Sequence, residues 1–371
     1  MSKRTPLAAV HERAGATFTD FAGYDMPVRY TSDLAEHHAV RDAAGLFDLS
    51  HMAEIEVRGP GAAACVDYAL SNQLSALEDG QAKYSLLLAE DGGVIDDLIV
   101  YRLGADHYFI VANAANREAA YRALAERSAG FDAVVTDTSD DWALVAVQGP
   151  RALEIMLAAS PIQPASSLTD LRYYRVLEAN VAGAAGYIAR TGYTGEDGFE
   201  IFVPAERAET LWDELVATGA PFGLALCGLA CRDTLRLEAG MPLYGHELRL
   251  DVTPAQAGLG RVADMTKESF VGKKGLAENP DGSGRVLVGL AAEGKRAPRQ
   301  DYPVLDATGS THVGVVTSGA LSPTLGYPIA MAYVDAELAE IGTSLLVDVR
   351  GSHLAVTVTK RPFYQRKKDT P

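Results

Sequence analysis

Residues 84–112, YSLLLAEDGGVIDDLIVYRLGADHYFIVA, decide the fold class that this sequence predicts. They contain three apolar runs, Tyr84–Ala89, Val94–Leu103 and Tyr108–Ala112, which only short segments with Gly and Asp separate. Runs of this length and composition are typical of strands. Because no helix-length segment lies between them, we expect the strands to pair antiparallel. This favours an α+β class over a doubly wound parallel sheet.

Further strands and helices are expected on both sides of this stretch. Apolar runs predict strands at Ala53–Val57, Ala143–Gln148, Tyr187–Arg190 and Phe199–Val203. Amphipathic or capped segments predict helices at Leu34–Ala44, Asn116–Ser128, Arg151–Ala159 and Pro204–Gly219. In the first of these helices, Asp33 and Glu36 resemble a capping box, and Gly45 is expected to end the helix.

A change of composition near residue 280 predicts a domain boundary. The segment ENPDGSG, Glu278–Gly284, is polar and contains one Pro and two Gly, as linkers do. Only strand-like runs follow it, at Val286–Ala291, Gly314–Thr317, Ile329–Val334, Leu345–Val349 and Leu354–Thr359. We therefore expect a first region at residues 1–280 and a small all-β domain, a barrel or a sandwich, at residues 281–371.

The charge and the apolar segments limit the class of partner. The chain has 371 residues and a formal net charge of −16. This argues against nucleic acid or an anionic membrane as the main partner, because phosphate binding needs clustered Lys and Arg. Residues 1–13 lack the apolar core of a secretory signal peptide, and no apolar run reaches membrane-spanning length. We expect a folded cytoplasmic protein.

The motifs of several common cofactors are absent from the sequence. It contains no GxGxxG after a strand, no GxxxxGK[ST], no HExxH and no GxSxG. Three cysteines, Cys65, Cys227 and Cys231, form no disulfide framework, and the last two supply too few ligands for a metal. We therefore expect no metal site.

Two adjacent carboxylates interrupt the apolar segment GGVIDDLIV, Gly92–Val100. Successive side chains of a strand point to opposite faces, so at most one of Asp96 and Asp97 normally faces a given cavity. An ionised carboxylate among Val, Ile and Leu is costly unless other groups satisfy it. The pair indicates either a catalytic acid or a strand-edge aspartate that caps a turn, and the residues alone leave both open.

A glycine-rich loop, RTGYTGEDGFE at Arg190–Glu200, is the second candidate. Its glycines allow tight turns and a close approach to a ligand. Glu200 could accept paired hydrogen bonds from a planar ring edge, and Tyr193 could stack on such a ring. The alternative is a hairpin whose acids are solvated.

The third candidate is ACRDTLRLEAG, Ala230–Gly240, a predicted helix that carries Arg232 and Arg236. Such an arginine could present its planar guanidinium to a pocket. The alternative is a surface ladder of i,i+4 ion pairs.

Together these segments resemble the T-protein family of the glycine cleavage system. The most specific part of the resemblance combines IDDL, Ile95–Leu98, with TGYTGEDGFE, Thr191–Glu200. Other matching motifs run over nearly the whole chain, at Arg4–Leu7, Asp20–Tyr24, Met26–Pro27, Phe47–Met52, Arg232–Gly240, Leu243–Gly245, Thr317–Gly326 and Lys360–Phe363.

The resemblance implies a fold and a reaction. The fold is a three-domain cloverleaf around a folate channel, in which two interleaved mixed α/β domains precede a C-terminal β-barrel. The reaction transfers a one-carbon unit from the aminomethyl-lipoyl arm of H-protein to tetrahydrofolate, giving 5,10-methylenetetrahydrofolate and ammonia. Tetrahydrofolate and the lipoylated H-protein are thus the expected substrate and partner, and no metal is required.

The resemblance also implies site residues, position by position. Asp97 matches the family's essential acid beside the folate nitrogens. The expected folate-binding residues are Glu200 and Arg232, which match residues that hold the pterin, with Tyr193, Val111, Asn113, Tyr84 and Arg299 as further matches along the channel. The chain departs from the family pattern at Cys231, where Ala is usual, and at Tyr24, where Trp is commoner.

Relatives of the same fold have other functions. One is a folate-dependent demethylase of a sulfonium compound, and another is a folate-binding assembly factor for iron–sulfur clusters. The assembly factors carry a Cys in the short motif where this chain has YTGE, Tyr193–Glu196, which favours the transferase. The demethylase function stays open as an alternative.

The basic tail, Lys360–Lys368, either lies free in solvent or helps to dock H-protein.

Overall fold

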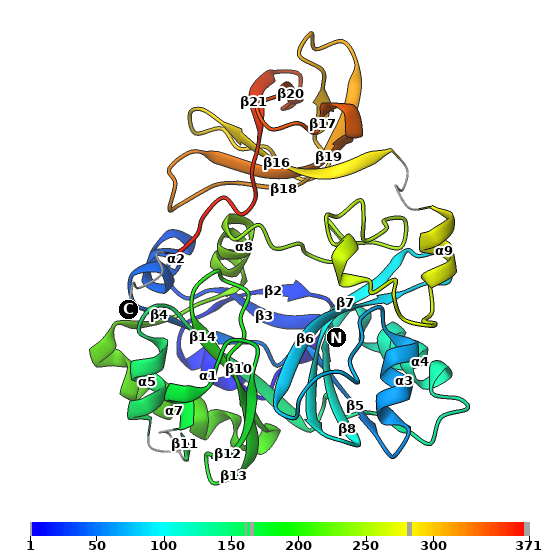
Figure 1. Ribbon diagram of the computed structural model, residues 1–371. Coiled ribbons are helices and arrows are strands. Elements are labelled where there is room, and N and C mark those ends of the chain that lie inside the picture. The colour runs from blue at the N-terminus through cyan, green and yellow to red at the C-terminus, as the bar shows by residue number, and fades with distance from the viewer. Residues whose placement is uncertain (1, 160–161, 164–166, 280–283, 367–371) are drawn as a thin grey trace.

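The computed structural model describes residues 2–159, 162–163, 167–279 and 284–366. Figure 1 shows a barrel above two larger sheets and their helices. The predicted boundary between residues 280 and 281 and part of the predicted linker lie outside the described residues, as do Lys367 and Lys368 of the basic tail. The position of the domain boundary therefore stays a prediction.

The strands predicted within residues 84–112 lie in a five-stranded sheet of order β6-β7-β8-β5-β9. Its strands are β5 (Ala53–Arg58), β6 (Gln81–Leu88), β7 (Val94–Gly104), β8 (His107–Ala112) and β9 (Val134–Asp137). All neighbours pair antiparallel, as predicted. One face is covered by α3 (Ala62–Ala69) and α4 (Arg117–Arg127), which share a hydrophobic core with it. The other face packs toward the second sheet.

The second sheet has seven strands in the order β11-β12-β13-β14-β10-β4-β15. They are β4 (Ala44–Asp48), β10 (Trp142–Gln148), β11 (Ile162–Gln163), β12 (Val176–Val181), β13 (Ala184–Ala189), β14 (Gly198–Pro204) and β15 (Leu224–Leu226). In the chain, β4 precedes the five-stranded sheet and β10 follows it, yet the two strands are neighbours here. The chain thus leaves this sheet, builds the other and returns, so the two units are interleaved.

Besides the barrel strands, the described chain contains a third, smaller sheet and further helical segments. A small sheet has the order β1-β3-β2. Its strands and the other helical segments are β1 (Lys3–Arg4), β2 (Thr17–Phe21), β3 (Tyr24–Arg29), α1 (Ala8–Arg13), α2 (Asp33–Asp42), α5 (Ala152–Ala158), α6 (Ser167–Asp170), α7 (Ala208–Gly219), α8 (Leu229–Glu238), α9 (Lys273–Glu278) and five short 3-10 turns, Ala114–Asn116, Ala205–Arg207, Ala220–Phe222, Gly260–Val262 and Ala336–Leu338. Within the described ranges, no helix is long and apolar enough to cross a membrane.

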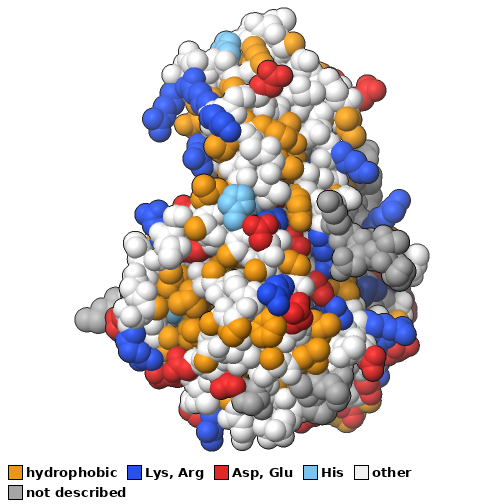
Figure 2. Space-filling model, turned by 90° about the vertical axis from the view of Figure 1, so that its left-hand side faces the viewer, with side chains coloured by type: hydrophobic (Ala, Val, Ile, Leu, Met, Phe, Trp, Pro, Cys, Tyr) orange, Lys and Arg blue, Asp and Glu red, His pale blue; other side chains and the backbone are white. Residues whose placement is uncertain are grey.

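The C-terminal strands close into a barrel of order β16-β19-β18-β17-β20-β21. They are β16 (Arg285–Ala292), β17 (Pro303–Leu305), β18 (His312–Leu321), β19 (Pro328–Asp335), β20 (Ser344–Asp348) and β21 (His353–Thr359). In Figure 2 the molecule narrows on one side where the barrel meets the body beneath it. The predicted α+β class with a C-terminal β-barrel is therefore confirmed, and the barrel replaces the sandwich alternative.

The helix α2 begins and ends at other residues than predicted. Ser32 is its N-cap, because the Ser32 hydroxyl accepts a hydrogen bond from the amide of Ala35 (3.2 Å). The predicted capping box with Asp33 as the cap was therefore wrong. The helix ends before Gly45, which lies inside β4. Glycine is needed there because a Cβ would lie 2.5 Å from a methyl carbon of Val40.

Glu36 has a different role from the predicted one. Its side chain is buried, and Oε1 accepts hydrogen bonds from the amides of Tyr30 (2.7 Å) and Thr31 (2.8 Å). Its Oε2 accepts a hydrogen bond from the amide of Gly228 (2.9 Å), just before α8. One carboxylate therefore joins the chain before α2 to the start of α8.

We predict that Glu36→Ala lowers the free energy of unfolding by about 3 kcal/mol or more, since three backbone amides lose their acceptor and an unsatisfied buried group costs about 1–3 kcal/mol. Chemical denaturation monitored by circular dichroism measures this change. Asp33→Ala, at the residue wrongly predicted as the cap, is the matched control and should change stability by less than about 0.5 kcal/mol. Equal effects of the two substitutions would contradict the assignment.

Candidate active site

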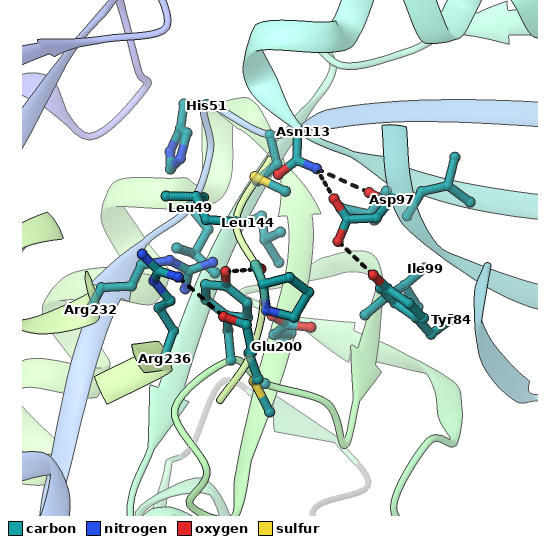
Figure 3. A pocket seen from close by; sticks show the side chains of 18 of the residues that line it. Leu49, His51, Tyr84, Asp97, Ile99, Asn113, Leu144, Glu200, Arg232 and Arg236 are labelled. Carbon is teal, nitrogen blue, oxygen red and sulfur yellow. Dashed lines mark hydrogen bonds between the residues drawn. The ribbon is translucent and has the colours of Figure 1, made fainter. Parts of the chain in front are cut away.

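A cavity of about 530 Å³ lies between the two sheets, and α8 with the loop after it forms a third wall. Its polar lining comes from different elements that face one another. Tyr84 on β6 and Asp97 on β7 lie on one side, and Glu200 on β14 and Arg232 on α8 lie on the other (Figure 3). Among the described residues that line the cavity, none belongs to the barrel.

Asp97 is held by two neutral donors. Tyr84 Oη donates to Asp97 Oδ2 (2.9 Å), and Asn113 Nδ2 donates to Oδ1 (2.9 Å). Tyr84 pairs with Ile99 across the sheet, so it is a diagonal neighbour of Asp97 on the same face. Burial raises the pKa of Asp97, although the hydrogen bonds from Tyr84 and Asn113 oppose this shift. The carboxyl therefore holds a proton more readily than an exposed aspartate does.

Asp96 does not line the cavity, as the alternation along a strand predicted. Its carboxylate accepts hydrogen bonds from the backbone amide of Asn113 (3.0 Å) and from Nδ2 of Asn116 (2.7 Å). Asn113 Nδ2 also donates to it (2.8 Å), so one amide group contacts both aspartates. Burial and the neighbouring Asp97 raise the pKa of Asp96. Asp96 thus caps the turn before α4, while Asp97 faces the cavity.

Glu200 is a buried carboxylate on the opposite wall. The Thr191 hydroxyl donates to its Oε2 through a short hydrogen bond, and Tyr101 Oη donates to the same oxygen (3.4 Å). Burial raises the pKa of Glu200, whereas Thr191, the charge of Arg232 and Tyr101 lower it. The alternative of a hairpin with solvated acids was therefore wrong for Glu200.

Gln148 fixes the glycine-rich loop next to Glu200. Its Nε2 donates to the carbonyl of Thr191 (3.1 Å), and its Oε1 accepts from the hydroxyl of Thr194 (3.0 Å). Gly192 and Gly198 lie against this side chain, where a Cβ would come within 2.0 Å and 2.4 Å of Gln148 atoms. A side chain at Gly192 would displace the end of Gln148, and one at Gly198 would also lie 2.6 Å from the carbonyl oxygen of Val147, so glycine at both positions suits the close approach of the loop to β10.

The arginines of α8 have separate roles. Arg232 lines the cavity, and its guanidinium lies over the ring of Tyr193, 5.0 Å from the ring centroid. Burial lowers the pKa of Arg232, and the charge of Glu200 opposes this. Arg236 also lines the cavity, but it is buried and pairs with Glu247 (3.0 Å), so the predicted alternative of a surface ion-pair ladder was wrong for it.

Most of the predicted site residues meet at this cavity. Those that line it are Asp97, Tyr84, Val111, Asn113, Tyr193, Glu200 and Arg232. Arg299 does not: it lies exposed after β16, where it donates to the carbonyl of Gly319 (3.4 Å). Its predicted role stays a prediction that this geometry does not support.

Other lining residues, among them Tyr101, His51 and His246, were not predicted from the sequence. Tyr101 follows Asp97 and Ile99 at a spacing of two on β7, so the alternation of the strand could have found it. His51 lies in the motif Phe47–Met52, which gives it no role by itself, and no local pattern points to His246. Among the described residues, no group of three or more His, Cys, Asp or Glu is placed to hold a metal ion.

Two sequence families match consecutive parts of the chain. The family called GCVT N-terminal domain matches residues 7–267. The family called glycine cleavage T-protein C-terminal barrel domain matches residues 285–365. The second match covers all six barrel strands.

Similar proteins cover almost the full length of the chain. An aminomethyltransferase of Cutibacterium acnes is 57% identical over 98% of this chain and 99% of its own. One of Streptomyces avermitilis is 55% identical over 99% of this chain and 98% of its own. The crystal structure of the glycine cleavage system aminomethyltransferase T from Bartonella henselae has a TM-score of 0.92 and is 37% identical, covering 98% of this chain and 99% of its own.

The family, the relatives and the shared fold agree with one another. They do not favour the demethylase or the iron–sulfur assembly factor, because these relatives are aminomethyltransferases. The chain therefore belongs to the glycine cleavage T-protein family and catalyses aminomethyl transfer.

Proposed function

We propose that the cavity binds tetrahydrofolate and receives the aminomethyl-lipoyl arm of H-protein, so that the one-carbon unit reaches the folate nitrogens beside Asp97. The observation that carries this proposal is the placement of Asp97 on one side of the cavity and of Glu200 and Arg232 on the other. Membership of the family supports the reaction. A volume of about 530 Å³ suits a pterin ring with part of its side chain.

The polar edge of the pterin would lie at Glu200 and Arg232. The hydrogen bonds from Thr191 and Tyr101 occupy Glu200 Oε2, which leaves Oε1 to accept from ring N–H groups. The guanidinium of Arg232 is the complementary donor for a ring carbonyl or nitrogen. With this edge fixed, the rest of the ligand would extend across the cavity toward Asp97.

The transfer requires proton movement at the folate nitrogens. The methylene carbon leaves the lipoyl sulfur and the amine nitrogen and forms bonds to N5 and N10 of the folate. Each folate nitrogen loses one proton, and overall one proton goes to the lipoyl sulfur and one to the departing ammonia. A carboxylate of raised pKa accepts a proton readily and stabilises positive charge on the reacting nitrogens. We assign both roles to Asp97.

Calorimetry with tetrahydrofolate under anaerobic conditions should show saturable binding that Glu200→Ala weakens about 10- to 100-fold, since a hydrogen bond to a charged group is worth about 1.5–3 kcal/mol. Glu206→Ala, at an exposed residue just after the same strand, is the control and should bind as the unsubstituted protein does. No binding heat with the unsubstituted protein would reject the folate pocket.

Asp97→Asn should lower the rate of 5,10-methylenetetrahydrofolate formation from aminomethylated H-protein by about 10²–10⁴-fold, because Asn can neither carry the charge nor accept the proton. The fold should be retained, since Asn is nearly isosteric with Asp. Asp96→Asn should be milder, because Asp96 lies outside the cavity. If Asp96→Asn were the more damaging substitution, the choice between the two aspartates would be wrong.

The rate should also depend on pH through Asp97. Because burial raises its pKa, the carboxyl gains a proton at a pH above about 4, where an ordinary aspartate titrates. The transfer rate should therefore fall about tenfold per pH unit on the acid side of this raised pKa. Single-turnover rates between pH 5 and pH 8 measure this limb. The limb should vanish in Asp97→Asn; its persistence there would assign the titration to another group.

A further inference from the structure

His51 lies in the cavity wall, in the turn between β4 and β5 and on the Arg232 side (Figure 3). The turn is fixed by Asp48, whose Oδ1 accepts a hydrogen bond from the amide of Ser50 (2.8 Å). Phe21 packs edge-on against the imidazole, with the ring centroids 5.4 Å apart. The ring is thus held in place, with only 1% of the residue exposed.

The Nδ1 atom of His51 is buried and has no hydrogen-bond partner among the described residues. Among the described residues that line the cavity, no other side chain has a nitrogen or oxygen atom that is both fully enclosed by the protein and unpaired. Buried polar atoms in folded proteins are nearly always paired, so an unpaired one calls for a partner that the chain does not supply. A ligand in the cavity would supply it.

The other buried histidines of the described chain differ from His51 in this respect. Tyr30 and Asp48 contact the two ring nitrogens of His11, each at 2.9 Å. Thr234 and Thr324 contact those of His37, each at 2.8 Å. Both ring nitrogens of these two histidines are thus paired, whereas Nδ1 of His51, in the wall of the cavity, has no partner among the described residues.

The electrostatic surroundings keep the ring of His51 neutral. Burial lowers the pKa of His51 to about 4, and the nearby charge of Arg232 contributes to this shift. A neutral imidazole has one N–H donor and one acceptor nitrogen. Such a group complements a heterocycle whose edge alternates donors and acceptors, and it adds no charge to the site.

We propose that His51 is a further ligand-binding residue, whose Nδ1 hydrogen-bonds the polar ring edge of the bound reduced folate that Glu200 and Arg232 also face. This inference rests on the proposed function. The amine of the aminomethyl group is expected at Asp97, on the far side of the cavity in Figure 3, so it is not the partner of His51.

Binding of tetrahydrofolate to His51 variants tests this proposal. His51→Phe should weaken binding about 5- to 10-fold, the loss expected for one neutral hydrogen bond, without lowering the melting temperature of the ligand-free protein. His51→Asn, which keeps a polar group near the position of Nδ1, should recover part of the affinity. The control His312→Gln, at an exposed histidine of the barrel that does not line the cavity, should leave the dissociation constant unchanged.

A measurement on the unsubstituted protein gives an independent readout. With ¹⁵N-labelled histidine, the ring signals of His51, assigned by their loss in His51→Asn, should shift as tetrahydrofolate saturates the site. Affinities of both His51 variants within twofold of the unsubstituted protein, or ring signals that do not move at saturation, would overturn the proposal. Absence of binding by the unsubstituted protein is a different result, which would overturn the folate pocket and this inference with it.

Discussion

The buried carboxylate of Glu238 is the point at which three parts of the chain meet. It ends α8, and it accepts hydrogen bonds from Arg41 of α2 (2.8 Å) and from the amide of Thr324 in the hairpin between β18 and β19 (3.0 Å). Burial alone would raise its pKa, but the hydrogen bonds from His37, Ser322 and Arg41 lower it to about 2. The charge is therefore retained in the interior, and loss of one partner would cost about 3–5 kcal/mol, as in other broken buried pairs.

The position of α8 depends on this contact, and the candidate active site depends on α8. Arg232 lies less than two turns before Glu238 on the same helix. Between them, Arg236 donates to Ser318 of the barrel (2.7 Å) and to Glu247 (3.0 Å). Since no barrel residue is among the described lining of the cavity, the barrel affects the site through this helix. Through α8, the barrel thus fixes the position at which the guanidinium of Arg232 faces the cavity.

Local patterns in the sequence predicted the parts of the structure that depend on local geometry. The alternation along β7 separated Asp96 from Asp97, and the absence of helices between the strands around it gave the antiparallel sheet. The roles of Glu36 and His51 could not be predicted in this way. Glu36 accepts a hydrogen bond from the amide of Gly228, which is 192 residues away in the sequence. The lack of a partner for His51 Nδ1 can be recognised only from the three-dimensional surroundings of the ring. Most of the residues that the resemblance predicted for the site line the cavity, but Arg299 does not.

The two carboxylates of the cavity differ in the charge that surrounds them, and this difference supports their separate roles. Asp97 accepts hydrogen bonds from a phenol and an amide, both neutral, and makes no ion pair among the described residues. Burial raises the pKa of Glu200 as well, but the guanidinium of Arg232 lies nearby and its positive charge opposes that shift. A group that accepts a proton during the reaction gains basicity when no cation stabilises its ionised form. A group that serves only as an acceptor is best kept ionised by a neighbouring cation. We therefore propose proton transfer at Asp97 and ligand recognition at Glu200.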